Sequence, residues 1–163
     1  MGLQIPGELA NLLNDLGYNW PKADEEKLFQ LGGHWLEYSG SLQQAVQDAG
    51  TSAQRVWADN RGDAVEAFKT RWEAQDSPHA VLTDGVTAAQ AIGGCLFVCA
   101  AIVLALKINV IVQLTILLIE IIQAIATAPE TFGASLLEVP VFKKICDMAV
   151  NFIINKAMEA ILG

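Results

Sequence analysis

Residues 86–128 carry only two charged side chains, Lys107 and Glu120, and this long apolar segment limits what the chain can fold into. Such a segment must be covered by other parts of a protein or by lipid, because exposing it to water is costly. Gly93 and Gly94 are expected to loosen it near its start, and Lys107 with Asn109 to interrupt it in the middle. The first of the two resulting runs is short for a membrane span, so a buried core helix is favoured over insertion.

The charge of the chain is unevenly distributed. The net charge is −8, and residues 1–84 hold 13 of the 18 acids and 6 of the 10 bases. We therefore expect a single domain over residues 1–163, with an acidic helical hairpin in residues 1–84 and an apolar helical part in residues 85–163. Lys and Arg form no cluster, which argues against a nucleic-acid partner.

Apolar and small residues recur in alternating steps of three and four after an acidic helix start at Asp24. This heptad spacing predicts a long helix over residues 24–59 that packs against an antiparallel helix over residues 63–76. A short helix within residues 1–18 and a last amphipathic helix after Pro140 are also expected, and no segment alternates with period two. The fold class is therefore all-α, a helical bundle with about five helices. The predicted packing seam contains Leu28, Leu31, Trp35, Tyr38, Leu42 and Trp72.

The stretch WADNRGDAVEAFKTRW, residues 57–72, predicts the tip of the hairpin. The residues ADNRG break the helical pattern, and Asp63 with Glu66 three residues later resembles a capping box that starts the second helix. Ser77 before Pro78 is expected to cap a further helix. Aromatic residues on both sides of the turn can stack across the hairpin and bury a large area.

GDAVEAF matches the Gly-x-Ala-x-x-x-Phe continuation of the Trp-x-Gly hairpin proteins exported by type VII secretion systems, although Trp57 stands five residues before Gly62 where short members have two. Together with MGLQIPGELANLLNDLGYNWPKADEEKLFQLG and VLALKINVIVQLTILLIEIIQAIATAPETFGA, the tip resembles the N-terminal domain of actinobacterial type VII-secreted polymorphic toxins. That group is typified by an outer membrane channel protein with a C-terminal necrotizing toxin. The resemblance covers nearly the whole chain.

The resemblance implies a non-catalytic delivery module, with a toxin domain downstream. By matching position, the targeting residues of the hairpin tip are Trp57, Gly62, Ala64 and Phe68. The implied partners are the type VII secretion machinery or a small helical partner or chaperone. The companion Tyr-x-x-x-Asp/Glu export signal is missing, since Lys22 and Leu42 stand four residues after Tyr18 and Tyr38, so a partner supplies it or this branch uses another signal.

The N-terminus has no basic region followed by an apolar run and a cleavage site, so a Sec-independent route is expected. The protein would be cytoplasmic before export and then secreted or held in the cell envelope. We expect no enzyme activity, no catalytic residues, no cofactor and no metal. His34 and His79 lack partners at ligand spacing, and the three cysteines are expected to be core residues.

One polar stripe runs along the apolar helix after Lys107. At 100° per residue its members fall on one side, so we expect them to face protein or trapped water, and Glu120 to receive a hydrogen bond from another helix or a second subunit. Two alternatives stay open: a membrane-inserting or channel-forming domain that uses residues 86–128, and a structural oligomeric bundle. Either could involve a homo-oligomer or a membrane. The stripe contains Asn109, Gln113, Glu120, Gln123 and Thr127.

Overall fold

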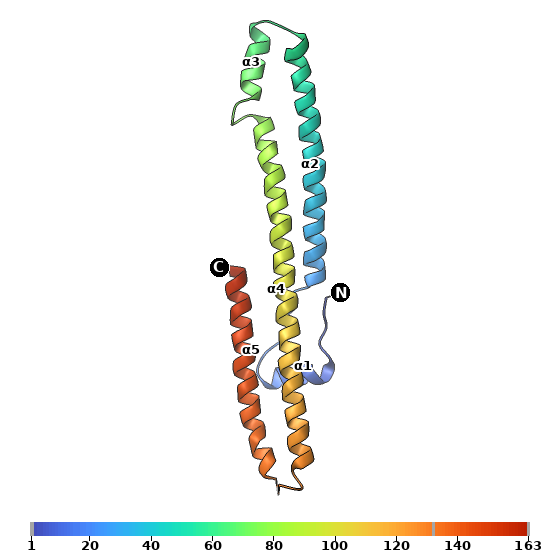
Figure 1. Cartoon of the computed structure of the whole chain (residues 1–163), viewed down its shortest axis with the longest axis vertical. Coiled ribbons are helices and arrows are strands. Elements are labelled where there is room, and N and C mark those ends of the chain that lie inside the picture. The colour runs from blue at the N-terminus through green and yellow to red at the C-terminus, as the bar shows by residue number, and fades with distance from the viewer. Residues whose placement is uncertain (1, 132, 163) are drawn as a thin grey trace. The chain divides into compact units, whose positions relative to one another are not determined.

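The computed structural model describes residues 2–131 and 133–162, and these residues form helices joined by short connections (Figure 1). The elements are α1 (Gly7–Asp15), α2 (Glu25–Asp59), α3 (Asp63–Trp72), α4 (Pro78–Thr127), a 3-10 helix η1 (Ala134–Glu138) and α5 (Val139–Leu162). No strand occurs among the described residues. The predicted all-α fold is confirmed.

Helix α4 is continuous from Pro78 to Thr127, so the predicted interruption at Lys107 and Asn109 is wrong, and the glycines expected to loosen the segment, Gly93 and Gly94, do not break the helix. Its start is as predicted, because the Ser77 hydroxyl accepts a hydrogen bond from Ala80 N at 3.1 Å. Gly93 allows α2 and α4 to approach each other closely, since a Cβ at this position would lie 3.0 Å from Gly32 O. Lysine is a good helix former, so polarity alone does not end a helix.

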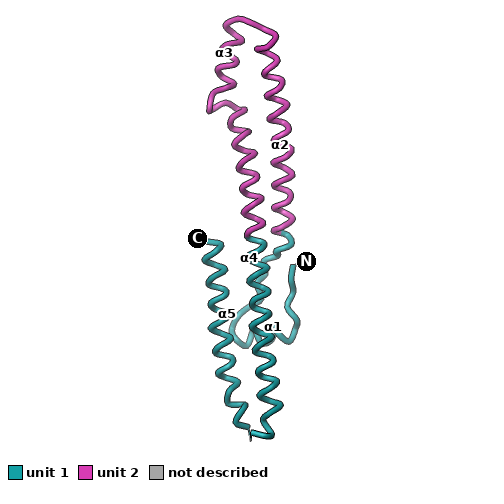
Figure 2. Tube along the Cα trace, in the orientation of Figure 1, with its two compact units in different colours: residues 1–27, 99–163 teal, residues 28–98 magenta. Residues whose placement is uncertain are grey.

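The chain divides into two compact units, which Figure 2 colours separately. Unit 1 contains residues 1–27 and 99–163, and unit 2 contains residues 28–98. This division does not follow the change in charge at residues 84 and 85, because α4 contributes to both units.

In unit 2, α2 runs antiparallel to α3 and to the first part of α4 (Figure 2). The buried residues of α2 recur every seven positions, as heptad packing requires. Several are small, which lets the two helices approach closely: a Cβ on Gly32 would lie 2.9 Å from Phe97 Cε1. These buried residues are Gly32, Ser39, Val46 and Ala53.

This register differs from the predicted seam. Leu31 and Tyr38 are 46% and 55% exposed, because the glycine and the serine that directly follow them occupy the contact instead. Leu28, Trp35 and Leu42 lie at its edge and are half-buried. The prediction followed apolar character, whereas the close contact selects small side chains.

In unit 1, α1 and α5 pack against the second part of α4. Leu9 and Leu13 of α1 are buried, and the Tyr18 hydroxyl donates a hydrogen bond to Asp147 Oδ1 of α5 at 2.8 Å. This apolar cluster removes large aliphatic side chains from water, which is the main favourable term in its packing. Its buried members are Leu9, Leu13, Val110, Leu114, Leu117, Cys146 and Val150.

We predict that Gly32→Ala lowers the free energy of unfolding by roughly 1–2 kcal/mol, because the new methyl group must displace Phe97 or the Gly93 carbonyl. Gly33→Ala is the matched control: a Cβ there meets nothing within 4 Å, and alanine favours helix by about 0.5–1 kcal/mol. Urea denaturation followed by circular dichroism measures both. Equal effects of the two substitutions would contradict the close contact.

Candidate functional site

The hairpin tip of unit 2 is built by side chains that end α2 and by a glycine that starts α3. Arg61 Nη1 donates hydrogen bonds to the carbonyls of Trp57 at 3.0 Å and Ala58 at 3.2 Å. Asn60 Nδ2 donates to Val56 O at 2.8 Å. These bonds satisfy carbonyls that the helix leaves without partners, which explains why ADNRG ends it.

Gly62 makes the turn into α3. Its φ of 121° lies where residues with a Cβ are strained, and its carbonyl accepts hydrogen bonds from Val65 N and Glu66 N at 3.0 and 3.2 Å. Gly62 is the N-cap, with no side-chain cap, so the predicted capping box of Asp63 and Glu66 is wrong. Asp63 instead lies in the first turn, where the helix dipole favours an acid.

Four rings follow one another next to the tip, and we call them the aromatic row: Trp57, Phe68, Trp72 and His79. Successive ring centroids are 5.8, 5.9 and 4.9 Å apart, with interplanar angles of 44°, 38° and 33°. These distances are typical of favourable aromatic pairs. The structure thus brings together Trp57 and Phe68 of the predicted tip, and it places Trp72 in this row instead of the seam. Ala64 is exposed.

His79 was missed by the sequence reasoning, which treated it as an isolated residue after Pro78. No local spacing signals its contact with Trp72, because the non-helical residues 73–77 separate α3 from α4 and helical periodicity does not extend across them.

Two predicted seam residues form a separate aromatic contact on α2. Trp35 and Tyr38 meet edge to face, with centroids 5.9 Å apart and an angle of 87°. Together with Leu31 and His34 they line a shallow apolar hollow. Tyr38 therefore forms part of an exposed surface of unit 2 and does not belong to its packed contact.

The predicted polar stripe lies at the edge of the packed face of α4. Gln113 and Glu120 are half-buried near Cys146 of α5, whose Sγ donates to Gln113 O at 3.7 Å. Burial raises the pKa of the Cys146 thiol, and the Glu120 and Asp147 carboxylates raise it further. The other stripe members, Asn109, Gln123 and Thr127, are exposed.

The stripe members find their hydrogen bonds mostly within their own helix. Asn109 Nδ2 donates to Ala105 O, and Thr127 Oγ1 donates to Gln123 O, both at 2.9 Å. Among residues 2–131 and 133–162, no residue donates a hydrogen bond to the Glu120 carboxylate. The donor expected from another helix is therefore not found in the described chain.

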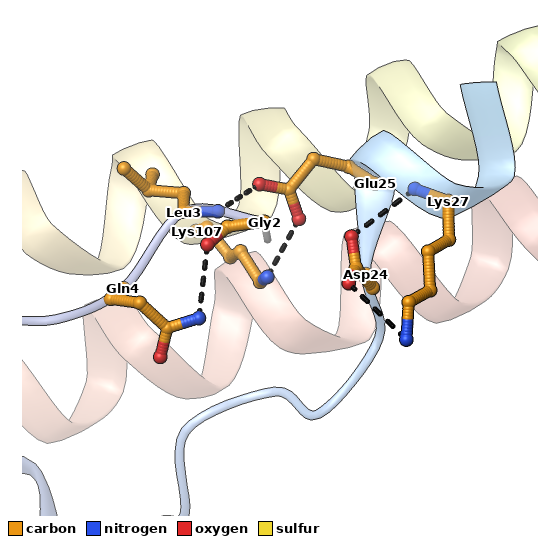
Figure 3. A network of polar contacts seen from close by, with 7 residues as sticks. All are labelled: Gly2, Leu3, Gln4, Asp24, Glu25, Lys27 and Lys107. Carbon is orange, nitrogen blue, oxygen red and sulfur yellow. Dashed lines mark hydrogen bonds and ion pairs between the residues drawn. The ribbon is translucent and has the colours of Figure 1, made fainter. Parts of the chain in front are cut away.

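Unit 1 contains a buried ion pair that the sequence reasoning missed (Figure 3). Lys107 is only 2% exposed, and its Nζ donates to Glu25 Oε2 at 2.6 Å. The other oxygen, Oε1, accepts a hydrogen bond from Leu3 N. Lys107 Nζ also lies 5.8 Å from the centroid of the Trp20 ring, a cation–π distance. We call Lys107, Glu25, Leu3 and Trp20 the Lys107 clamp.

The surroundings of the Lys107 clamp are close-packed. A Cβ on Gly2 would lie 2.6 Å from Glu25 Oε2, so a side chain at the second position would displace the carboxylate that pairs with Lys107. Figure 3 shows Gly2 and Leu3 beside the Glu25 carboxylate. Asp24 is held separately, since its Oδ1 accepts a hydrogen bond from Lys27 N at 3.1 Å.

The Glu25 carboxylate is stabilised in its charged form. Burial raises its pKa, but the bonds from Lys107 Nζ and Leu3 N lower it more, and the resulting pKa is about 2. Because this pKa is below the ordinary value of 4.5, Glu25 contributes stability that is fully present above pH 4.5. That contribution is lost as the pH falls through about 2.

A signal for the Lys107 clamp was present in the sequence. A lysine inside a long apolar helix must be paired if it is buried, because an unpaired buried charge is very costly. Candidates for that partner were the acids at the start of the predicted helix over residues 24–59, namely Asp24, Glu25 and Glu26. Sequence reasoning instead assigned these acids to the helix dipole.

The structure shows no constellation suited to metal chemistry among the residues it describes: no group of three His, Cys, Asp or Glu could hold an ion. One candidate membrane-spanning stretch, Asp63–Thr127, which includes α3 and α4, is long and apolar enough to cross a membrane by length and composition. In its most apolar window only 22% of the residues are buried. The sequence predicted a buried core helix for this segment, and the low burial differs from that prediction.

The comparison with protein families gives one match: the family model described as WXG100 like domain covers residues 6–142. The chain belongs to the WXG100-like family. Domains of this family work in type VII secretion, often as partners or dimers, and the family's all-helical fold is typically non-catalytic. Searches of the curated proteins and of the solved structures gave no match.

A WXG100-like chain with this clamp allows a direct test of its energetics. We predict that Lys107→Met lowers the free energy of unfolding by about 3–5 kcal/mol, because it leaves the Glu25 carboxylate buried without its partner. Adding Glu25→Gln recovers most of the loss, because the buried charge is then removed as well. Urea denaturation at pH 7 measures both variants.

Lys27→Met is the matched control, since Lys27 is exposed and its contact with Asp24 is 3.9 Å long. It should change stability by less than about 0.5 kcal/mol. Glu25→Gln alone should also flatten the loss of stability between pH 4.5 and pH 2. A Lys107→Met chain as stable as the original would contradict a tightly paired clamp.

Proposed function

We propose that the chain is a non-catalytic delivery module that targets a polymorphic toxin to type VII secretion. The observation that carries this proposal is the aromatic row at the tip of an antiparallel WXG100-like hairpin. Membership of the family supports a role in type VII secretion. The toxin is a separate domain further along the gene, and its activity lies outside this helical module.

The tip suits recognition by a protein. Phe68 is 38% exposed beside the half-buried ring of Trp57, so the secretion machinery can contact aromatic surface held in a fixed arrangement. Gly62 fixes the turn that presents it. Aromatic residues are enriched at the energetically important positions of protein interfaces.

The proposed route begins in the cytoplasm and leads through a type VII system to the cell envelope or the medium. Lys22 and Leu42 stand four residues after Tyr18 and Tyr38, so in this proposal a small helical partner supplies the Tyr-x-x-x-Asp/Glu signal or this branch uses another signal. The exposed hollow of Leu31, Trp35 and Tyr38 on α2 offers such a partner an apolar surface.

We predict that Trp57→Ala combined with Phe68→Ala lowers secretion of a fused reporter several-fold in a bacterium with a matching type VII system. The physical reason is loss of two neighbouring rings of the recognised surface. The ratio of reporter in the medium to reporter in cells measures the effect. Phe29→Ala is the matched control, because it removes an exposed ring from the same helix, away from both the tip and the hollow around Trp35.

Each variant must also be compared for folding, because loss of a buried aromatic costs about 3–5 kcal/mol at most. Circular dichroism and a thermal transition identify chains that have unfolded. Unchanged secretion of the folded double variant would reject the targeting role of the tip.

Membrane insertion is a second candidate function, and the exposure of α4 favours it. On its outer face Ile108, Val112, Ile119 and Ile122 are each about half exposed. The face lies opposite the buried Val110, Leu114 and Leu117. Lipid would cover this apolar face without burying a charged side chain, since Glu120 and Gln113 lie on the edge toward Cys146.

We predict that spin labels report lipid-type oxygen accessibility at position 122 and protection at positions 113 and 120 in phospholipid vesicles. The labels are placed singly in a chain whose three native cysteines are replaced by alanine. The expected difference follows from the exposed and half-buried faces of α4. Lipid accessibility at 113 and 120 with protection at 122 would contradict this orientation, and water accessibility at all three would exclude insertion.

A further inference from the structure

A groove of about 750 Å³ runs between α2 and α4 within unit 2. Its floor includes Val46 and Val86, and Gly50 leaves space at one end because it has no side chain. Of the described residues that line the groove, none is Asp, Glu, Lys or Arg. Four glutamines and three threonines line its walls, among them Gln43, Gln47, Gln54, Gln90, Thr83 and Thr87.

The polar groups of these walls are available to a ligand. Within the described part of the chain, no hydrogen bond occupies the side-chain amides of the four glutamines, and all four side chains are exposed. Each amide has two N–H donors and a carbonyl acceptor close together. The walls therefore offer donors and acceptors in nearly equal measure, without charge.

The groove continues toward the aromatic row. A second hollow of about 450 Å³ shares Gly50, Gln54 and His79 with it and adds the half-buried rings of Trp57 and Trp72. His79 lies against Trp72, with centroids 4.9 Å apart. One end of the groove thus offers flat apolar ring surface beside neutral amides and the carboxylate of Glu73, which can accept hydrogen bonds from hydroxyl groups.

These features exclude several ligand classes. A phosphate or other anion would need a cation, and no lysine or arginine lines the groove among the described residues. A lipid chain would need apolar walls, whereas the walls here carry unpaired amides. A sugar ring fits both properties, because its hydroxyl groups donate and accept hydrogen bonds and its C–H faces are apolar.

We propose that this groove binds a neutral saccharide, with a ring stacked on Trp57 or Trp72 and hydroxyl groups bonded to the glutamine amides. This site shares Trp57 with the proposed targeting tip, but it also requires the glutamines of the groove. The glutamines of the groove lie one to four helical turns away along α2 and α4, so substitutions there can test it separately.

The test is a titration of the full chain, labelled with ¹⁵N, with chitotetraose, cellotetraose and maltotetraose. At least one should shift the indole N–H signals of Trp57 and Trp72 and the glutamine side-chain signals in a saturable manner. The indole signals of Trp20 and Trp35 stay fixed and serve as an internal control, since neither residue lines the groove.

Gln47→Ala combined with Gln90→Ala should weaken that binding by about tenfold, because two hydrogen-bonding partners are lost while alanine keeps the helices intact. Gln44→Ala is the matched control, since Gln44 is exposed on the same helix but does not line the groove. No saturable shift with any of the three saccharides would overturn the proposal. An equal loss of binding in Gln44→Ala would also overturn it. The proposal would likewise be wrong if the groove signals shifted only when a helical protein partner was added.

Discussion

The Lys107–Glu25 ion pair decides how the N-terminal segment is arranged in unit 1. A lysine that is 2% exposed on an apolar helix is tolerable only with a partner, and Glu25 supplies that partner at 2.6 Å. Glu25 also accepts the Leu3 N–H, so one carboxylate holds the chain start and α4 together. A buried ion pair adds little net stability compared with apolar packing, but it makes any other register costly because two charges would lose their partners.

With that register established, the rest of unit 1 depends on ordinary apolar packing. Leu9 and Leu13 of α1 meet Leu114 of α4 in one buried cluster. Unit 2 uses a different principle, in which small residues such as Gly32 and Gly93 allow close backbone approach. A single helix, α4, thus provides small contact residues in one unit and large ones in the other. This difference explains why no single apolar pattern describes the whole helix.

The sequence predicts the parts of this fold that depend on local signals. Helical periodicity, the turn at Gly62 and the Ser77 cap act within one or two turns, and each is present in the structure. The register of α2 could not be predicted this way, because it depends on Gly32 meeting Gly93 across 61 positions of sequence. The Lys107 clamp likewise joins residues 82 positions apart. In the candidate site, the pairing of Trp57 with Phe68 followed from the predicted hairpin, whereas the place of His79 depended on how α3 and α4 connect.

The outer face of α4 in unit 1 repeats in steps of four and three through Ile108, Val112, Thr115, Ile119 and Ile122. This spacing would also suit a coiled-coil partner. Coiled-coil partners, however, are usually selected by charged residues that flank the seam, and between Asn109 and Thr127 the only charged residue is Glu120. Glu120 lies toward Cys146 of α5 and away from the outer face. A surface that is apolar, rich in β-branched residues and without flanking charges has little means of choosing one protein partner over another. Lipid requires no such choice, so the chemistry of this face is compatible with the membrane insertion proposed as the second candidate function.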